Sequence, residues 1–140
     1  MSTPTKRAGL EQGRAAYAWR CVEAGNQLTK SKEYKSYVKK MPMLIKTNGL
    51  GAAVAFALAK GSGKDGKADI KHPWGLIYHQ MEVWLKEAPC KPEELGQKTL
   101  AYALTEVESA SYRAVTVESL ALLAWMKRFV DALIEGEAQE

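Results

Sequence analysis

A chain of 140 residues is long enough for one domain with its own buried core and too short for several. Its 46% of apolar residues excludes wholesale disorder, and its most apolar run, residues 50–59, is too short to cross a bilayer, so we expect one domain over residues 1–140 with no membrane role. Residues 1–71 carry 14 Lys/Arg against 5 Asp/Glu (net +9) and residues 72–140 carry 6 against 11 (net −5), a polarity that suits a polyanion on one surface and basic proteins on another.

Apolar residues recur at helical spacing, and no segment shows the alternating pattern of a strand bounded by turn residues. We expect a first helix over residues 8–25, after frayed residues 1–7, and a second over residues 30–41. Pro42 ends the second helix and begins a third over residues 42–60, because proline is favoured in a first helical turn. This third helix is nearly all apolar, so we expect other helices to surround it at the centre of the fold.

The second half of the chain continues the helical pattern. Pro73 begins a helix that runs to about residue 87, and Pro92 opens a fifth. Around residues 108–120 the chain kinks or restarts, with Thr116 as N-cap of a last helix that ends near residue 134, before a frayed tail over residues 135–140. The predicted fold class is all-α, a single compact bundle of about six helices, in which Trp74 and Trp125 fit core and interface positions equally well.

The stretch KGSGKDGKAD, residues 60–69, contains the G-x-x-x-x-G-K frame of a phosphate-binding P-loop. A P-loop needs Ser or Thr after the lysine to ligate Mg²⁺, and it follows a buried strand. Here Ala68 follows Lys67 and a helix that ends near Gly61 precedes the frame. We therefore interpret the stretch as a solvated loop with Gly61 as a helix C-cap.

The usual components of an active site are hard to assemble from this sequence. His72 and His79 lack a third metal ligand at useful spacing, and we expect His72 at a helix boundary and His79 partly buried with a hydrogen-bond partner. Cys21 falls on an apolar helix face, and Cys90 lies in a Pro-rich loop without an identifiable partner. Two separated thiols without a signal peptide indicate a reducing, cytoplasmic setting. We predict no enzyme activity, no catalytic residue, no metal and no cofactor.

A basic surface is better supported. Residues 30–46 carry six lysines against one acid, Glu33, and the lysines at 32, 35 and 39 form a stripe along one helix face. Lysines neutralise phosphates, while the tyrosine spacing in this interval is that of a buried stripe. Four further basic residues on other helices can join the same surface: Arg14, Arg20, Lys127 and Arg128. No RNA-recognition motif, zinc finger or helix-turn-helix is present, so we expect sequence-independent contact.

Three stretches together resemble the small helical subunit family of the type III-B CRISPR effector, the Cmr complex. They are MPMLIKTNGLGAAVAFALAK, WGLIYHQMEVWL and YRAVTVESLALLAWMKRFVDAL, in the family's order, and the resemblance is weak only before Tyr17. It implies a non-catalytic subunit whose copies stack as a minor filament beside the RAMP-type backbone subunit. Its other implied partners are the large subunit, the guide RNA and the target RNA, whose duplex the basic face helps to hold.

The resemblance also assigns residues. Lys46, Asn48 and Arg113 match the family's polar positions, while Asn48 can also be a local cap and Arg113 fits a bond to helix-end carbonyls equally well. The basic pair near the C-terminus is Lys127 and Arg128, with lysine in place of the family's first arginine. The RNA-binding prediction rests on charge alone for four residues: Arg20, Lys35, Lys39 and Lys40. The alternative is a helical adaptor whose basic face docks an acidic protein and has no nucleic-acid role.

Overall fold

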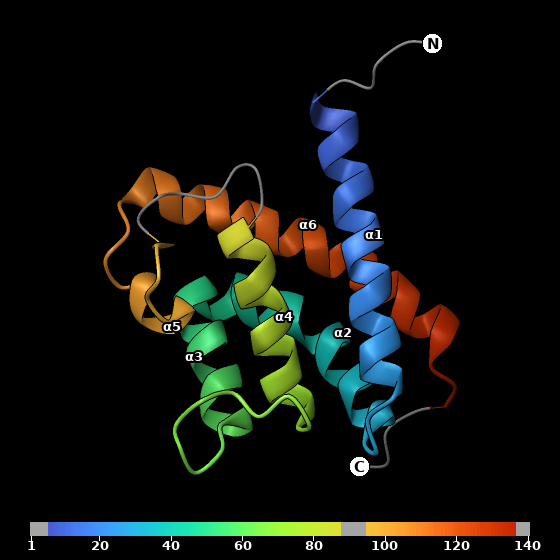
Figure 1. Cartoon of the computed structure of the whole chain (residues 1–140). Coiled ribbons are helices and arrows are strands. Elements are labelled where there is room, and N and C mark those ends of the chain that lie inside the picture. Colours follow the sequence, from blue (N-terminus) through green and yellow to red (C-terminus); the bar gives the residue numbers. More distant parts are fainter. Residues whose placement is uncertain (1–5, 88–94, 137–140) are drawn as a thin grey trace.

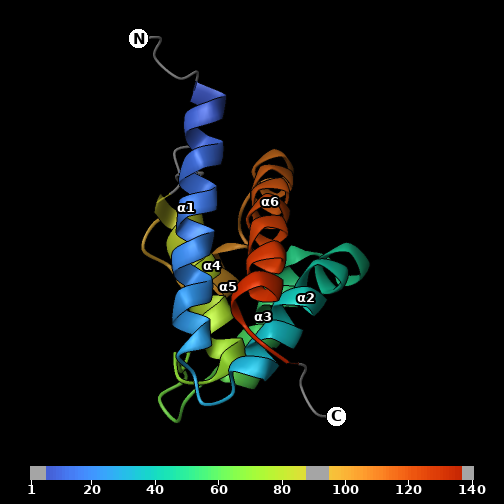
Figure 2. The same cartoon turned by 90° about the vertical axis from the view of Figure 1, so that its right-hand side faces the viewer.

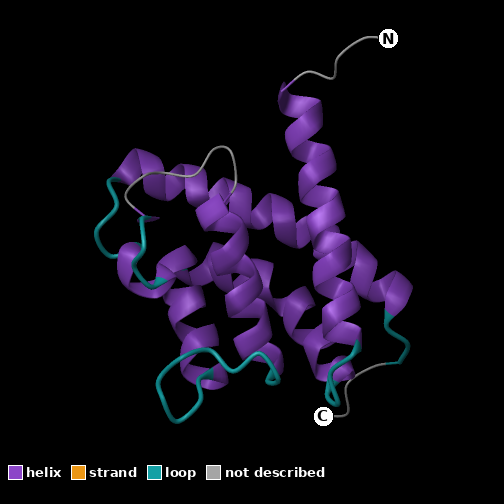
Figure 3. Ribbon diagram, viewed as in Figure 1, coloured by secondary structure: helices purple, strands orange, loops and turns teal. Residues whose placement is uncertain are grey.

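Residues 6–87 and 95–136 are described in the computed structural model, and they form six α-helices with no strand among them (Figures 1 and 3). The helices in chain order are α1 (Lys6–Asn26), α2 (Ser31–Asn48), α3 (Leu50–Gly61), α4 (Pro73–Glu87), α5 (Leu100–Ala103) and α6 (Ser109–Leu133). The predicted all-α bundle of about six helices is confirmed. Within the described ranges no helix is long and apolar enough to span a membrane.

The longest helix, α6, lies at the centre of the bundle. α1 and α4 pack on one side of it and α2 on the other, while α3 packs on α2 and α4 (Figures 1 and 2). Four α6 side chains are completely buried at helical spacing: Leu122, Leu123, Met126 and Val130. Burial of these side chains against the neighbouring helices stabilises α6, since an amphipathic helix gains most of its stability from packing of its apolar face.

The sequence predicted that the second helix ends at Pro42, and this is wrong. The helix continues to Asn48 with Pro42 in its interior. Proline cannot donate a hydrogen bond to the carbonyl four residues earlier, which normally breaks a helix. Met41 and Ile45, on either side of Pro42, are 0% and 3% exposed, so their burial favours continuation of the helix. The break falls instead at Gly49, whose φ of 91° is accessible mainly to glycine.

The prediction that the third helix is surrounded by other helices is also wrong. α3 begins only at Leu50, and its packed side contains Leu50, Val54 and Ala57. Its opposite side is exposed and small except for one ring: Ala52, Ala55, Phe56 and Ala59. α3 is therefore a peripheral helix with an uncovered apolar side.

The bounds of the last two helices, α5 and α6, also differ from those predicted. No restart occurs at Thr116, because α6 begins at Ser109 and runs unbroken, while the Thr116 hydroxyl donates to the Tyr112 carbonyl at 2.8 Å. Such a bond within a helix satisfies the hydroxyl without making it a cap. The fifth helix is only Leu100–Ala103, and Pro92 and Cys90 lie outside the described residues.

The Gly/Lys loop after α3 uses its own amide groups. The Gly63 amide donates to the Lys67 carbonyl at 2.8 Å, the Gly66 amide to Gly63 at 3.1 Å, and the Lys67 amide to the Asp65 carboxylate at 3.0 Å. A P-loop offers such amides to phosphate, so these contacts agree with the solvated-loop interpretation. The predicted C-cap role of Gly61 is wrong, because Gly61 is the last residue of α3 and Ser62 is its C-cap. A Cβ on Gly61 would lie 2.0 Å from the Gly75 amide nitrogen, so Gly61 lets α3 and α4 meet closely.

Candidate nucleic-acid interface

Two of the predicted RNA-binding lysines face the end of α6 instead of a common open surface. The Lys35 ammonium is buried and donates to the carbonyls of Ile134 at 2.9 Å and Gly136 at 3.1 Å. The Lys39 ammonium lies 3.0 Å from the Asp131 carboxylate. Cations at a helix C-terminus bind its unpaired carbonyls and oppose its dipole. The predicted lysine stripe thus has a structural role at Lys35 and Lys39.

Lys40 lies on a different side of α2. It is exposed, and its ammonium lies 5.8 Å from the centre of the Tyr37 ring. Tyr34, by contrast, is completely buried. Its hydroxyl donates to Gln80 Oε1 at 2.7 Å. The prediction of a buried tyrosine stripe therefore holds for Tyr34 and only partly for Tyr37, which is half-buried.

The junction between α2 and α3 meets the first turns of α6. The Gly51 amide donates to the Tyr112 hydroxyl at 2.7 Å, and a Cβ on Gly51 would lie 3.3 Å from that oxygen. Gly51 is thus small because Tyr112 is close. Lys46 and Asn48 are exposed just before this contact in sequence, and Arg113 is exposed directly after Tyr112. The structure brings together the two segments that carry these three predicted residues.

No side-chain hydrogen bond or ion pair is formed by Asn48 or Arg113 within the part of the chain that the structure describes. The carbonyl-capping role considered for Arg113 is not observed there, and the residue that caps the start of α3 is Gly49. Both side chains therefore remain available to a ligand. We refer to Lys46, Asn48 and Arg113 as the junction site.

The remaining predicted residues lie in two other places. Lys127 and Arg128 are exposed on α6, where Arg128 lies 5.7 Å from the Trp125 ring. Trp125 in turn packs on Phe129, and Trp19 of α1 packs on Phe129 at 5.2 Å between ring centres. Arg20 is also exposed but lies over the Tyr17 ring at 6.0 Å. Tyr17 faces α4, so Arg20 is not joined to Lys127 and Arg128 by these contacts.

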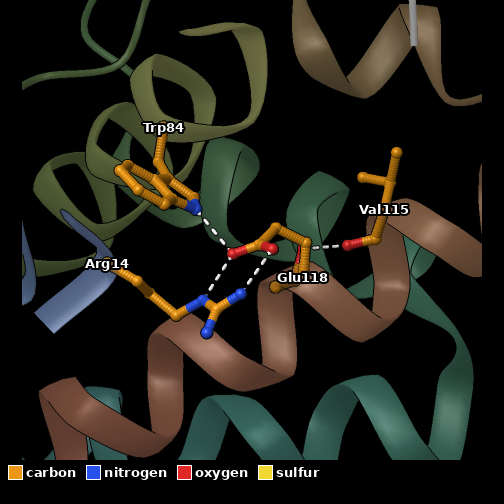
Figure 4. Close-up of polar contacts among 5 residues, drawn as sticks. Arg14, Trp84, Val115 and Glu118 are labelled. Atoms are coloured by element: carbon orange, nitrogen blue, oxygen red, sulfur yellow. Dashed lines mark hydrogen bonds and ion pairs between the residues drawn. The ribbon is translucent and has the colours of Figure 1, made fainter. Parts of the chain in front are cut away.

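Arg14, predicted as a surface cation, belongs to an internal ion pair. Its guanidinium donates to both carboxylate oxygens of Glu118, from Nε at 2.7 Å and from Nη2 at 2.8 Å (Figure 4). The Trp84 indole donates to the same carboxylate at 2.8 Å. The Glu118 side chain is only 7% exposed. This cluster joins α1, α4 and α6. Arg14 and Glu118 are 104 positions apart, so no sequence motif could have predicted their contact.

Potential catalytic groups are placed differently. Cys21 is buried as predicted, and burial raises the pKa of its thiol to about 12, so it is not a thiolate nucleophile. His72 lies at the start of α4, where its Nδ1 accepts the Trp74 amide at 3.1 Å, in line with a boundary residue. His79 is exposed, so its predicted burial is wrong. Within the described ranges no three His, Cys, Asp or Glu residues are grouped to hold a metal ion.

The fold defines a small α-helical protein, and cations and aromatic rings are among its exposed groups. A family model described as CRISPR-associated protein (Cas_Cmr5) matches residues 10–133. The chain belongs to the Cmr5 family, which confirms the resemblance found in its sequence.

Comparisons of sequence and of structure with Cmr5 from Thermus thermophilus both extend over most of the chain. The CRISPR system Cmr subunit Cmr5 is 29% identical over 103 residues, which cover 74% of this chain and 76% of that protein. A crystal structure of a CRISPR-associated Cmr5 family protein matches with a TM-score of 0.65 and 29% identity, covering 90% of this chain and 98% of that one. Both the sequence and the helix arrangement therefore support the family assignment.

Proposed function

We propose that this protein is a non-catalytic small subunit of the type III-B CRISPR effector, the Cmr complex, and that it holds RNA there. Membership of the Cmr5 family supports its place in the assembly. Copies of the chain stack as a minor filament in the cytoplasm, beside the RAMP-type backbone subunit and in contact with the large subunit. The protein acts by binding and positioning, since base pairing between guide and target reads the sequence.

The observation that carries the RNA role is the junction site. A lysine, an asparagine and an arginine face solvent where α2, α3 and α6 meet, and a glycine and a tyrosine fix that meeting. Lysine and arginine neutralise phosphates, and an amide can bond to phosphate or sugar oxygens. The arrangement suits a backbone contact that does not depend on base identity. Lys40, Lys127, Arg128 and Arg20 extend the proposed contact to other faces.

Lys35 and Lys39 are left out of the proposed RNA surface. Both ammonium groups already bind partners at the end of α6, and Lys35 is 6% exposed. Moving either group to a phosphate would first require the loss of these bonds. The proposed RNA surface is therefore narrower than the stripe predicted from lysine spacing.

Salt-dependent RNA binding by the full chain tests the proposal. A Lys46→Gln/Arg113→Gln variant removes two phosphate contacts, so the slope of log K against log salt should fall by about 1.4 for single-stranded RNA. A matched Lys30→Gln/Lys71→Gln variant removes two exposed lysines elsewhere and should keep the slope. An unchanged slope in the junction variant would contradict the assignment of these residues.

A pull-down from the native cells separates this function from an adaptor role. We expect short RNAs with a shared repeat-derived 5′ end to copurify with companion subunits. An RNA-free preparation, together with no affinity for any RNA at low salt, would favour the adaptor that docks an acidic protein.

A further inference from the structure

A row of aromatic rings crosses three helices next to the uncovered side of α3. The Tyr37 and Trp74 rings are stacked at 4.4 Å and 8° between planes, and Phe56 meets Trp74 edge to face at 5.2 Å and 87°. Lys40 lies 5.8 Å from the Tyr37 ring at one end, and Lys60 lies 5.8 Å from the Phe56 ring at the other. We call these five residues the aromatic row.

Only one ring of the row is substantially exposed. Phe56 is 40% exposed on α3, whereas Trp74 is 6% exposed and therefore supports the row from within. Stacking by Tyr37 fixes Trp74, and Trp74 holds an edge-to-face contact with Phe56. Aromatic pairs of this geometry add stability beyond the burial of their area. Phe56 is thus an exposed ring held in place before any ligand arrives.

The stretch of sequence that carries four of the row's five residues, between Glu33 and Asp65, is basic. Residues 34–64 contain six lysines and not one aspartate or glutamate, and they include all of α3 and most of α2. The lysines at both ends of the row, Lys40 and Lys60, are exposed. No ion pair to either of them is present within the described residues. An uncovered ring between two such cations complements a ligand with a flat face and negative charge on both sides.

We propose that the aromatic row is a second RNA contact, where an unpaired nucleotide of a single strand lays its base against Phe56. Lys40 and Lys60 bind the phosphates on either side. Every base has a flat face, so such a platform accepts any sequence. The inference rests on the proposed function and deepens it, since the junction site binds backbone and the row adds a place for a base.

The test compares variants of the full chain for binding of single-stranded oligouridine across a salt series. Phe56→Leu keeps an apolar side chain but removes the ring, and we expect a loss of affinity of about fivefold or more at every salt concentration with an unchanged slope. Lys60→Gln should instead lower the slope by about 0.7. Phe56→Tyr keeps the ring and should bind like the wild type. Lys30→Gln, another exposed lysine, should keep the slope.

Crosslinking with oligouridine that carries 5-iodouridine gives an independent readout, and the expected crosslink is in α3 at Phe56. Wild-type affinity in Phe56→Leu, or an equal slope change in Lys30→Gln and Lys60→Gln, would contradict RNA binding at the aromatic row. Neither result would affect the proposal that the junction site binds RNA. A Phe56→Leu variant that binds RNA normally but drops out of the purified complex would make the row a protein-docking surface instead. No RNA binding by the wild type at low salt would overturn the proposed function and the row together.

Discussion

The two sides of α2 carry the same kind of side chain in different environments. On the side that faces α6, Lys35 and Lys39 bind carbonyls and a carboxylate at the end of that helix. On another side, Lys40 is exposed above the Tyr37 ring and forms no ion pair within the described residues. Lysine spacing alone predicted one stripe, whereas the structure separates it into a structural half and an accessible half.

The arginines show the same division. Arg14 forms a bidentate ion pair with the almost fully buried carboxylate of Glu118. Arg113, in contrast, is exposed beside the junction of α2 and α3. A buried pair contributes to the fold through geometry, and an exposed cation contributes little to stability but can bind phosphate. The comparison therefore predicts that stability and RNA affinity depend on different basic residues.

The largest expected effect is on the buried side. Glu118→Gln keeps the shape of the side chain but leaves the Arg14 guanidinium without its carboxylate, which should lower the free energy of unfolding by about 3 kcal/mol. Urea unfolding followed by circular dichroism measures it. Glu11→Gln, at an exposed position of α1, serves as the matched control and should change stability by less than about 0.5 kcal/mol. Equal stability of the two variants would mean that the ion-paired cluster does not hold the three helices.

A smaller effect distinguishes the two halves of the lysine stripe. Lys35→Met keeps the aliphatic stem but loses the two carbonyl bonds, so we expect a loss of about 2 kcal/mol in the free energy of unfolding. Lys40→Met, further along the same helix, should be nearly neutral, at less than about 0.5 kcal/mol. RNA binding should respond in the opposite order, with a lower salt slope only for Lys40→Met. A common effect of both substitutions on either quantity would contradict the division.

The position of a helix was predictable where its apolar residues follow a single stripe and a helix-starting residue precedes them. The helix expected from Pro73 to about residue 87 is α4 with the same bounds, because its apolar residues follow one stripe and its proline stands at the start. Pro42 misled the prediction because a local helix-breaking signal competes with burial of Met41 and Ile45, which only the folded chain provides. The sequence shows a glycine at position 49, but the positive φ that ends the helix there is a property of the folded chain.

The site was predictable in composition but not in arrangement. The sequence showed that residues 30–46 are basic, yet the acceptors of Lys35 are carbonyls about a hundred positions away, and backbone carbonyls carry no signature in a sequence. The same holds for Glu118, because nothing in the sequence indicates that it is the partner of Arg14. Conversely, Lys46, Asn48 and Arg113 were singled out by family resemblance, and the Gly51 to Tyr112 contact shows why those segments belong together.

The last effect is absent at neutral pH and concerns the neutral buried groups where α1, α2 and α4 meet. Burial raises the pKa of Cys21 to about 12, and it also raises the pKa of Tyr34 above its usual range. The unfolded chain therefore releases these protons at lower pH than the folded chain, and stability falls as pH rises above about 9. A Cys21→Ala variant, compared with the wild type by urea unfolding from pH 7 to 11, should show a slope shallower by about 1.4 kcal/mol per pH unit once the unfolded thiol is ionised. Parallel curves would mean that the thiol ionises equally in both states.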